Sequence, residues 1–92
     1  MIEHFRHKGL KRLFQQGAAK GISRDLLEKL ENMLFILSRA RRPEDMNLPG
    51  FRLHRLKGDL KGFWSVIVRV NWRVIVRFEE GDAYNVDLID YH

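Results

Sequence analysis

The sequence predicts an α+β fold, in which helices from the first half of the chain pack on an antiparallel sheet formed by the second half. Apolar residues recur at helical spacing up to about residue 40, whereas from residue 64 they alternate with polar ones at every second position. Helices followed by strands are typical of the α+β class. Because residues 1–92 contain no repeat, low-complexity tract or linker, we expect a single domain.

Two helices are expected in the first half. The first begins near Phe5 and ends near Gly17, with its apolar residues on one stripe. Ser23 is a favourable N-cap for the second, and Asp25 stands in the first turn, where the helix dipole favours an anion. Leucine and methionine then recur at helical spacing to about Ala40, and a proline follows beyond the helix end.

Strands are expected in the second half. Residues 64–70 and 72–78 alternate with period two and meet at Val70 and Asn71, which predicts an antiparallel pair joined by a tight turn. Gly81 and Asp82 mark the next turn, and residues 84–89 form another expected strand. A shorter strand at residues 51–56 is expected to precede them. One face of the hairpin, rich in valine and tryptophan, should pack on the helices.

The other face of the hairpin carries Arg69, Arg73 and Arg77, with only Ile67 and Ile75 between them. Arginines on one sheet face repel one another unless anions lie nearby. Two interpretations stay open at this point. The face is either a solvated outer surface with acidic neighbours or a phosphate-binding surface.

The composition favours an anionic partner. Seventeen Lys and Arg residues against twelve Asp and Glu give a net charge of +5, which suits nucleic acid or an acidic protein, although solubility alone also explains it. The absence of cysteine excludes disulfides and thiolate zinc sites and fits a reducing compartment. The N-terminal sequence has no apolar stretch long enough for a signal peptide or a membrane span, so we expect a cytoplasmic protein.

The second half also carries the residue types that RNA cleavage requires. A base must take the proton of the ribose 2′-hydroxyl, cations must stabilise the phosphorane, and an acid must protonate the departing oxygen. Histidine serves best as acid or base near neutral pH. The candidate catalytic residues are His54, Asp90, Tyr91 and His92, and the candidate substrate-binding residues are Lys57, Arg69, Arg73 and Arg77.

Each candidate has a structural alternative. His54 is otherwise a packed or surface histidine, Lys57 belongs to a charged turn, and residues 90–92 form a frayed tail. Asp90 and His92 with His54 also form a conceivable metal site. Their spacing carries no metal-specific signature, so we expect neither a metal nor another cofactor.

Several segments together resemble the HigB toxins of the RelE/ParE superfamily. The resemblance covers essentially the whole chain and rests on residues 5–11 (FRHKGLK), 49–59 (PGFRLHRLKGD), 62–66 (GFWSV), 71–73 (NWR), 77–79 (RFE) and 90–92 (DYH). The chain departs from the family pattern at Phe51, where tryptophan is common, and at Arg55, where proline is common. It departs again at Val70, in place of a frequent glycine, and at Ile89, in place of an acidic residue.

The resemblance implies a fold, an activity and partners. It implies two helices on an antiparallel sheet, metal-free cleavage of messenger RNA in the A site of the 70S ribosome, and silencing by a HigA-like antitoxin. The toxin–antitoxin complex is expected to bind operator DNA through the antitoxin. The functional positions of the family match His54, Lys57, Arg73, Asp90, Tyr91 and His92 in this chain.

These matches lead to a hypothesis about roles. We expect His92 to act as the acid–base group, with Asp90 either orienting it or sharing the proton transfer, and the sequence leaves open which of His54 and His92 acts first. Lys57 and Arg73 are expected to bind the scissile phosphate, and Tyr91 to stack on or orient the nucleotide. The alternative function is a non-catalytic inhibitor of DNA gyrase like the ParE relatives, because one fold can carry unrelated activities. A plain RNA-binding module is a third reading, for which binding would depend steeply on salt.

Overall fold

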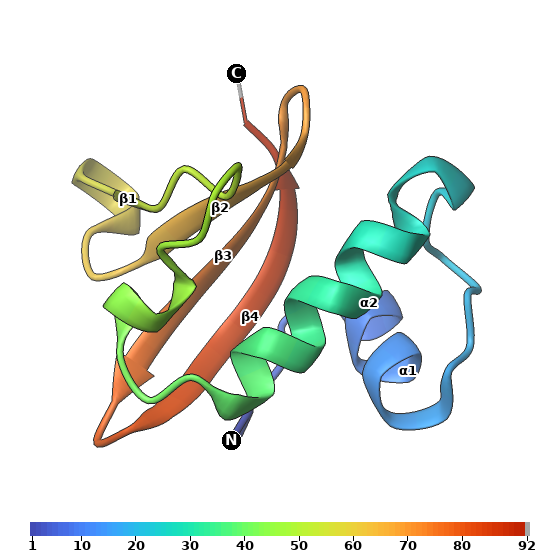
Figure 1. Cartoon of the computed structure of the whole chain (residues 1–92), viewed down its shortest axis with the longest axis horizontal. Helices are drawn as coiled ribbons and strands as arrows, with labels where there is room; N and C mark the ends of the chain where they lie inside the picture. The colour runs from blue at the N-terminus through green and yellow to red at the C-terminus, as the bar shows by residue number, and fades with distance from the viewer. Residues whose placement is uncertain (92) are drawn as a thin grey trace.

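The computed structural model describes residues 1–91, which form helices and an antiparallel sheet. Within these residues, α1 (Lys8–Gln16) and α2 (Arg24–Arg39) precede β1 (His54–Arg55), β2 (Trp64–Arg69), β3 (Trp72–Glu79) and β4 (Asp82–Asp90). The strands lie in the order β1-β2-β3-β4 (Figure 1). Short 3-10 helices, η1 (Pro43–Met46) and η2 (Gly58–Leu60), lie in the connections. This arrangement confirms the predicted α+β class.

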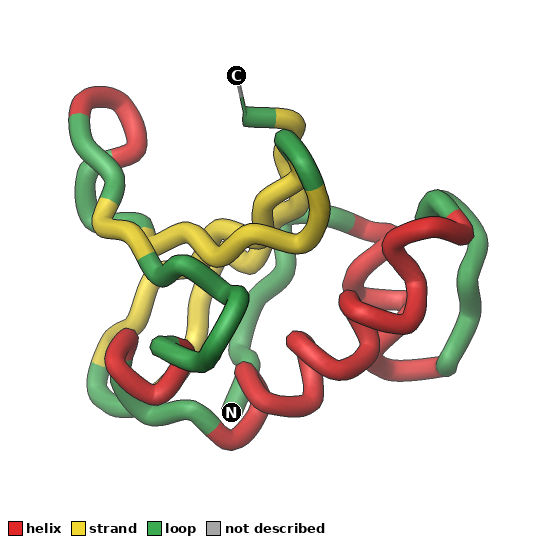
Figure 2. Tube along the Cα trace, turned by 45° about the horizontal axis from the view of Figure 1, so that its top comes forward, coloured by secondary structure: helices red, strands yellow, loops and turns green. Residues whose placement is uncertain are grey.

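The main core lies between the helices and one face of the sheet. Figure 2 shows both α-helices grouped together beside the strands. Most hairpin residues that alternation assigned to the buried face do pack there, among them Val66, Val68, Val74 and Val76, but Trp72 is 37% exposed. They meet apolar residues of α1 and α2, including Leu10, Leu30, Met33, Leu34 and Leu37.

The turn of the hairpin departs from this pattern. Strict alternation along residues 64–70 would put Val70 on the packed face with Val66 and Val68, but it is 76% exposed. It lies in the turn with a φ of 52°, so the strand alternation that would have directed its side chain into the core has already ended.

The helix boundaries follow local capping chemistry. Gly17 ends α1 in the left-handed conformation, with a φ of 68°, as its position predicted. The helix begins later than Phe5, because His7 is the N-cap and its Nδ1 accepts the N–H of Leu10 at 3.1 Å. Ser23 does stand at the N-cap of α2, although its side chain makes no capping hydrogen bond. Neither α-helix has the length and apolar character needed to cross a membrane.

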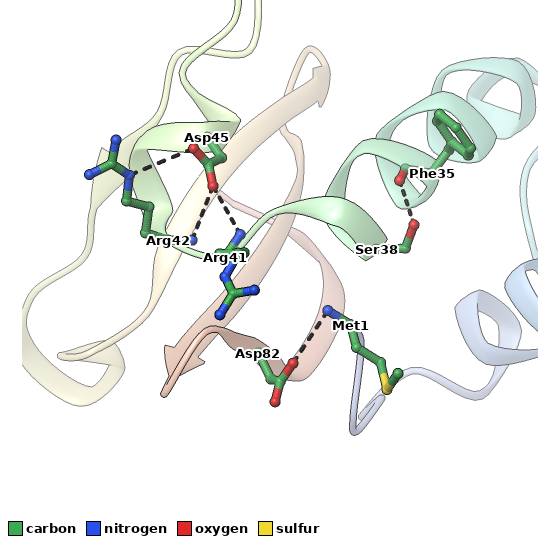
Figure 3. A network of polar contacts seen from close by, with 7 residues as sticks. All are labelled: Met1, Phe35, Ser38, Arg41, Arg42, Asp45 and Asp82. Atoms are coloured by element: carbon green, nitrogen blue, oxygen red, sulfur yellow. Dashed lines mark hydrogen bonds and ion pairs between the residues drawn. The ribbon is translucent and has the colours of Figure 1, made fainter.

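The first residues of the chain lie along the β4 edge of the sheet. Ile2 and Phe5 form parallel bridges with Ala83 and Val86. The terminal ammonium of Met1 also lies 3.4 Å from the carboxylate of Asp82 (Figure 3). These contacts cover part of an edge that would otherwise present unpaired backbone groups.

A second polar contact fixes the connection after α2. The carboxylate of Asp45 accepts the backbone N–H groups of Arg41 at 2.9 Å and of Arg42 at 3.3 Å (Figure 3). These bonds favour the ionised carboxylate, the one to Arg41 most strongly, and they lower the pKa of Asp45. The aspartate therefore holds the start of η1 in place.

The strand expected at residues 51–56 is much shorter than predicted. Only His54 and Arg55 pair with β2, opposite Ser65 and Trp64. Arg52 adopts a φ of 51°, which interrupts an extended segment, and Phe51 is buried in the main core. The expected strand at 84–89 is confirmed and extends further at both ends, as β4.

Candidate functional site

His54, Arg73 and Tyr91 meet in one pocket on the sheet face that points away from the helices. The pocket has a volume of about 370 Å³ and is lined by Arg52, Leu53, His54, Ile67, Arg73 and Tyr91. The pairing of β1, β2 and β3 explains why His54 and Arg73 lie close together. Ile67 lies directly opposite Arg73 in the β2–β3 pair, and His54 lies opposite Ser65 in the β1–β2 pair, two residues before Ile67. Directly paired residues share a face of the sheet, so His54, Ile67 and Arg73 project to the same side.

Arg73 is held against the aromatic ring of Tyr91. The guanidinium carbon lies 4.9 Å from the ring centroid, a cation–π geometry. The backbone N–H of Tyr91 donates to the carbonyl of Asn71 at 2.8 Å, which ties the segment after β4 to the β2–β3 turn. The Nε of Arg73 is buried without a hydrogen-bond partner among residues 1–91. The side chain is thus oriented by stacking, and because Arg73 is only partly buried, the rest of its guanidinium can donate to an anion.

A buried serine lies opposite His54 in the sheet. Ser65 is 0% exposed, and its Oγ has no hydrogen-bond partner among the described residues. It faces His54 on one neighbouring strand and Ile75 on the other. A buried hydroxyl without a partner is destabilising, so Ser65 is an unusual element of this region.

Lys57 lies in a different hollow from His54. The lysine lines a cavity of about 480 Å³ together with Arg55, Leu56, Gly58, Lys61 and Gly62. Its loop leaves the sheet after Arg55 and turns through η2, so sequence proximity to His54 does not bring the two side chains into one pocket. The structure therefore separates two residues that the sequence hypothesis had placed together.

The prediction that Arg69 shares a face with Arg73 is wrong. A bulge between Ile67 and Arg69 shifts the register, so that Arg69 lies opposite Trp72 and points toward the helices. Its Nη1 lies 3.6 Å from the carboxylate of Asp25 at the start of α2. One extra residue in the strand is enough to turn the Arg69 side chain to the opposite face of the sheet.

Arg77 does share its face with Arg73, as predicted, but it lies outside the pocket. Its guanidinium carbon is 5.9 Å from the centroid of Phe63, and its Nη2 is 3.8 Å from Glu79. Phe63, Leu56 and Ile75 form a small second core on this face. The arginine face is therefore partly covered by apolar residues, and the acidic neighbour of Arg77 fits the solvated-surface interpretation for that residue.

Asp90 and Tyr91 lie on opposite sides of the sheet. Asp90 pairs with Trp72 and lines a hollow of about 280 Å³ that also includes Arg69 and Asp25. Asp90 does not line the pocket of His54, so these two residues of the metal site considered above lie apart. Among residues 1–91, no group of three or more histidines and carboxylates is arranged to hold a metal ion. His92 lies outside the described residues, so its expected role beside Asp90 is untested.

Sequence reasoning missed Arg52, Leu53 and Ser65 in this region. Arg52 and Leu53 line the pocket because the left-handed conformation of Arg52 bends the segment before β1. No local pattern signals such a bend at a non-glycine residue. Ser65 does have a signal, since it is a polar residue in an otherwise apolar stretch of β2.

Comparisons with known proteins agree on one family. A family model described as the RelE-like toxin HigB of type II toxin–antitoxin systems matches residues 3–92. The chain is 40% identical over 92 residues to Endoribonuclease HigB of Proteus vulgaris, covering 100% of both chains. It is also 31% identical over 93 aligned positions to Toxin HigB-1 of Vibrio cholerae serotype O1, covering 96% of this chain and 95% of the relative.

Proposed function

The chain belongs to the HigB-like family of RelE-like toxins from type II toxin–antitoxin systems, and from this premise we propose that it is a metal-independent endoribonuclease. The proposed reaction is cleavage of messenger RNA in the ribosomal A site, which arrests translation. The observation that carries the proposal is the pocket in which a histidine, an arginine and a tyrosine converge. The relative named as an endoribonuclease, which matches the full length of the chain, supports a nuclease over a gyrase inhibitor.

The proposed chemistry uses the ribose next to the cut. The 2′-hydroxyl loses its proton to a base and attacks the adjacent phosphorus, and the bond from phosphorus to the 5′-oxygen of the next nucleotide breaks. The departing oxygen takes a proton from an acid. The products are a 2′,3′-cyclic phosphate and a free 5′-hydroxyl, and no external water is consumed in this step.

The pocket residues suit these roles. His54 is exposed in the pocket, and histidine is the residue type best suited to act as a general acid or base. Arg73 lines the pocket and offers the N–H groups of its guanidinium to the negative charge that develops on the phosphorane. Tyr91 holds Arg73 from one side and presents an aromatic face on which a base can stack.

The roles proposed for Asp90 and His92 rest on the family pattern and not on the pocket. The two residues match the acid–base pair of the family pattern. In this structure Asp90 lines the hollow that it shares with Arg69 and Asp25, on the other face of the sheet from the His54 pocket. We assign His92 the second proton transfer, with Asp90 as its orienting group. Lys57 contributes positive charge from the neighbouring loop, while Arg69 and Arg77 are assigned no contact with the scissile phosphate.

The family also implies the partners. A type II toxin has an antitoxin, and we assign a HigA-like protein to this role, with operator DNA bound by the complex through the antitoxin. The substrate is messenger RNA held by the 70S ribosome, which places the activity in the cytoplasm. A ribosome that fixes the message in line would compensate for a sparse set of catalytic groups.

The test is cleavage of a defined message by the purified chain in EDTA, with and without programmed ribosomes. We expect cuts that depend on ribosomes and persist in EDTA. The His54→Ala variant should cut at least about a hundred-fold more slowly, the typical loss for a general acid or base. The exposed His4 supplies a matched control, and His4→Ala should cut at the wild-type rate.

Two further results bear on the assignment. The His92→Ala variant should lose growth arrest while keeping the thermal melting profile of the wild type. Loss of the cuts in EDTA would revive a metal-dependent reaction. Growth arrest by folded protein that cuts no message under any condition would favour the gyrase inhibitor.

A further inference from the structure

The loop between β1 and β2 has a rigid, closed shape. Leu56 N–H donates to the carbonyl of Phe63 at 2.9 Å, and Phe63 N–H donates to Leu60 at 3.0 Å. Gly58 and Gly62 adopt left-handed conformations, with φ of 67° and 96°, that let the chain reverse twice. Leu56 and Phe63 are buried against Ile75 of β3, with Leu60 packed against them, so the loop is anchored to the sheet. Figure 2 shows it projecting on the side away from α1 and α2.

The outer surface of this loop is strongly cationic. Arg55, Lys57 and Lys61 are all exposed and line its hollow of about 480 Å³. The guanidinium carbon of Arg55 lies 5.0 Å from the ring centroid of Trp64, which holds the charge over a fixed platform. The stack therefore holds Arg55 in place, while Lys57 and Lys61 extend from a loop whose backbone is anchored to the sheet.

No carboxylate within residues 1–91 forms an ion pair with these cations. Ion pairs in this part of the chain join Arg42, Arg69 and Arg77 to acidic residues, but none involves Arg55, Lys57 or Lys61. This holds although Asp59 lies in the same loop. The charge stays available to a partner, and the partner that fits it is a polyanion.

The loop hollow and the His54 pocket flank the same edge strand. Successive residues of β1 point to opposite faces, so His54 lines one hollow and Arg55 lines the other. An RNA strand that crosses β1 meets both in turn. We propose that the loop hollow is a second RNA subsite, in which Arg55, Lys57 and Lys61 bind backbone phosphates neighbouring the one that is cut.

This subsite rests on the proposed nuclease function and replaces one expectation from the sequence. Lys57 binds a flanking phosphate in place of the scissile phosphate, because it lies outside the His54 pocket. The planar guanidinium of Arg55 can donate two hydrogen bonds to one phosphate, whereas the ammonium of Lys61 acts as a point charge. Contacts of this kind position the strand without reading its sequence.

The experiment measures the salt dependence of binding to a 2′-O-methyl RNA oligonucleotide of mixed sequence, which lacks the attacking hydroxyl. The double variant Arg55→Ala/Lys61→Ala should reduce the slope of log affinity against log salt by about 1.4 in magnitude, or about 0.7 for each lost phosphate contact. In cleavage assays the same variant should raise KM and leave kcat nearly unchanged, because the lost contacts bind substrate and transition state alike.

A matched control removes equivalent charges elsewhere. Arg39 lies 5.0 Å over the ring of Phe35 on α2, the same stacking that Arg55 makes with Trp64, and Lys29 is an exposed lysine of that helix. The double variant Arg39→Ala/Lys29→Ala should keep the wild-type slope. Equal slopes for the loop variant and the wild type, or equal losses in both double variants, would overturn the subsite.

The remaining outcomes distinguish a failure of the subsite proposal from a failure of the proposed nuclease function. A loop variant that binds ribosomes poorly but keeps the wild-type oligonucleotide slope would assign the cations to ribosomal RNA and overturn the proposal. A reduced slope in a chain that cuts no message would support the subsite and reject the nuclease. Cleavage that His54→Ala abolishes, combined with an unchanged slope in the loop variant, would support the nuclease and reject the subsite.

Discussion

Replacing Arg73 by lysine keeps the positive charge in the pocket but removes the geometry that the structure gives it. The guanidinium stacks on Tyr91 with its carbon 4.9 Å from the ring centroid, and its Nε is a buried donor without a partner among residues 1–91. Lysine lacks the planar fork whose N–H groups can bind two oxygens of one phosphate. The variant therefore loses at least one charge-assisted hydrogen bond to the phosphorane.

The size of the effect follows from that loss. A hydrogen bond to a charged group contributes about 1.5–3 kcal/mol. At about 1.36 kcal/mol for each factor of ten, the cleavage rate should fall about ten- to a hundred-fold. Folding should change little, because a partly exposed cation–π contact is worth only about 0.5–1 kcal/mol.

The assay is single-turnover cleavage of a message on programmed ribosomes, with thermal melting as the check on folding. Arg39→Lys is the control, because Arg39 makes an equivalent stack, 5.0 Å over Phe35, far from the pocket in sequence. It should cut at the wild-type rate. An Arg73→Lys variant that also cuts at the wild-type rate would refute the assignment, because bare charge would then suffice.

Three further predictions concern stability. Ser65→Ala should raise the free energy of unfolding by about 1 kcal/mol in urea titrations, because it removes a buried hydroxyl without a partner, and an equal decrease would mean that the hydroxyl is bonded. Leu30→Ala, at a fully buried position between the helices and the sheet, should lower the unfolding free energy by about 2–5 kcal/mol, whereas truncation of the exposed Phe35 should cost far less. The pKa of Asp45 is lowered from its ordinary 3.8 by backbone hydrogen bonds, so its stabilisation is present above that pH and is lost as the pH falls through the folded-state pKa. The difference in stability between wild type and Asp45→Asn should accordingly vanish in acid, and a difference that persists there, or one matched by the control Asp59→Asn, would contradict this account.

The sequence predicted the parts of the fold that depend on local periodicity. The β2–β3 hairpin alternates with period two over both strands, so its pairing and the buried position of Val74 could be read directly. Gly17 likewise predicted the end of α1. The bridges from Ile2 and Phe5 to β4 could not be predicted, because no repeating pattern links segments about eighty residues apart.

The candidate site was predicted in its residue types more fully than in its arrangement. His54 and Arg73 share a face of the sheet because of the pairing of β1, β2 and β3. Tyr91 joins them because its backbone N–H donates to the carbonyl of Asn71, in the β2–β3 turn. Arg69 was misplaced, because one bulge reverses the side to which a strand residue points. Lys57 was misplaced for another reason, since the chain leaves the sheet after Arg55 and the loop that follows puts Lys57 in a different hollow.

The central claim is that the chain cuts RNA by attack of the 2′-hydroxyl within the His54 pocket. The most direct test is a programmed ribosome whose message carries a single 2′-deoxynucleotide at the mapped cut position. The account predicts that the wild-type chain cuts the all-ribose message to a 2′,3′-cyclic phosphate and leaves the deoxy-substituted message intact at that position. Cleavage of the deoxy-substituted message at the same position and rate would contradict it, because the attacking group would then come from outside the RNA.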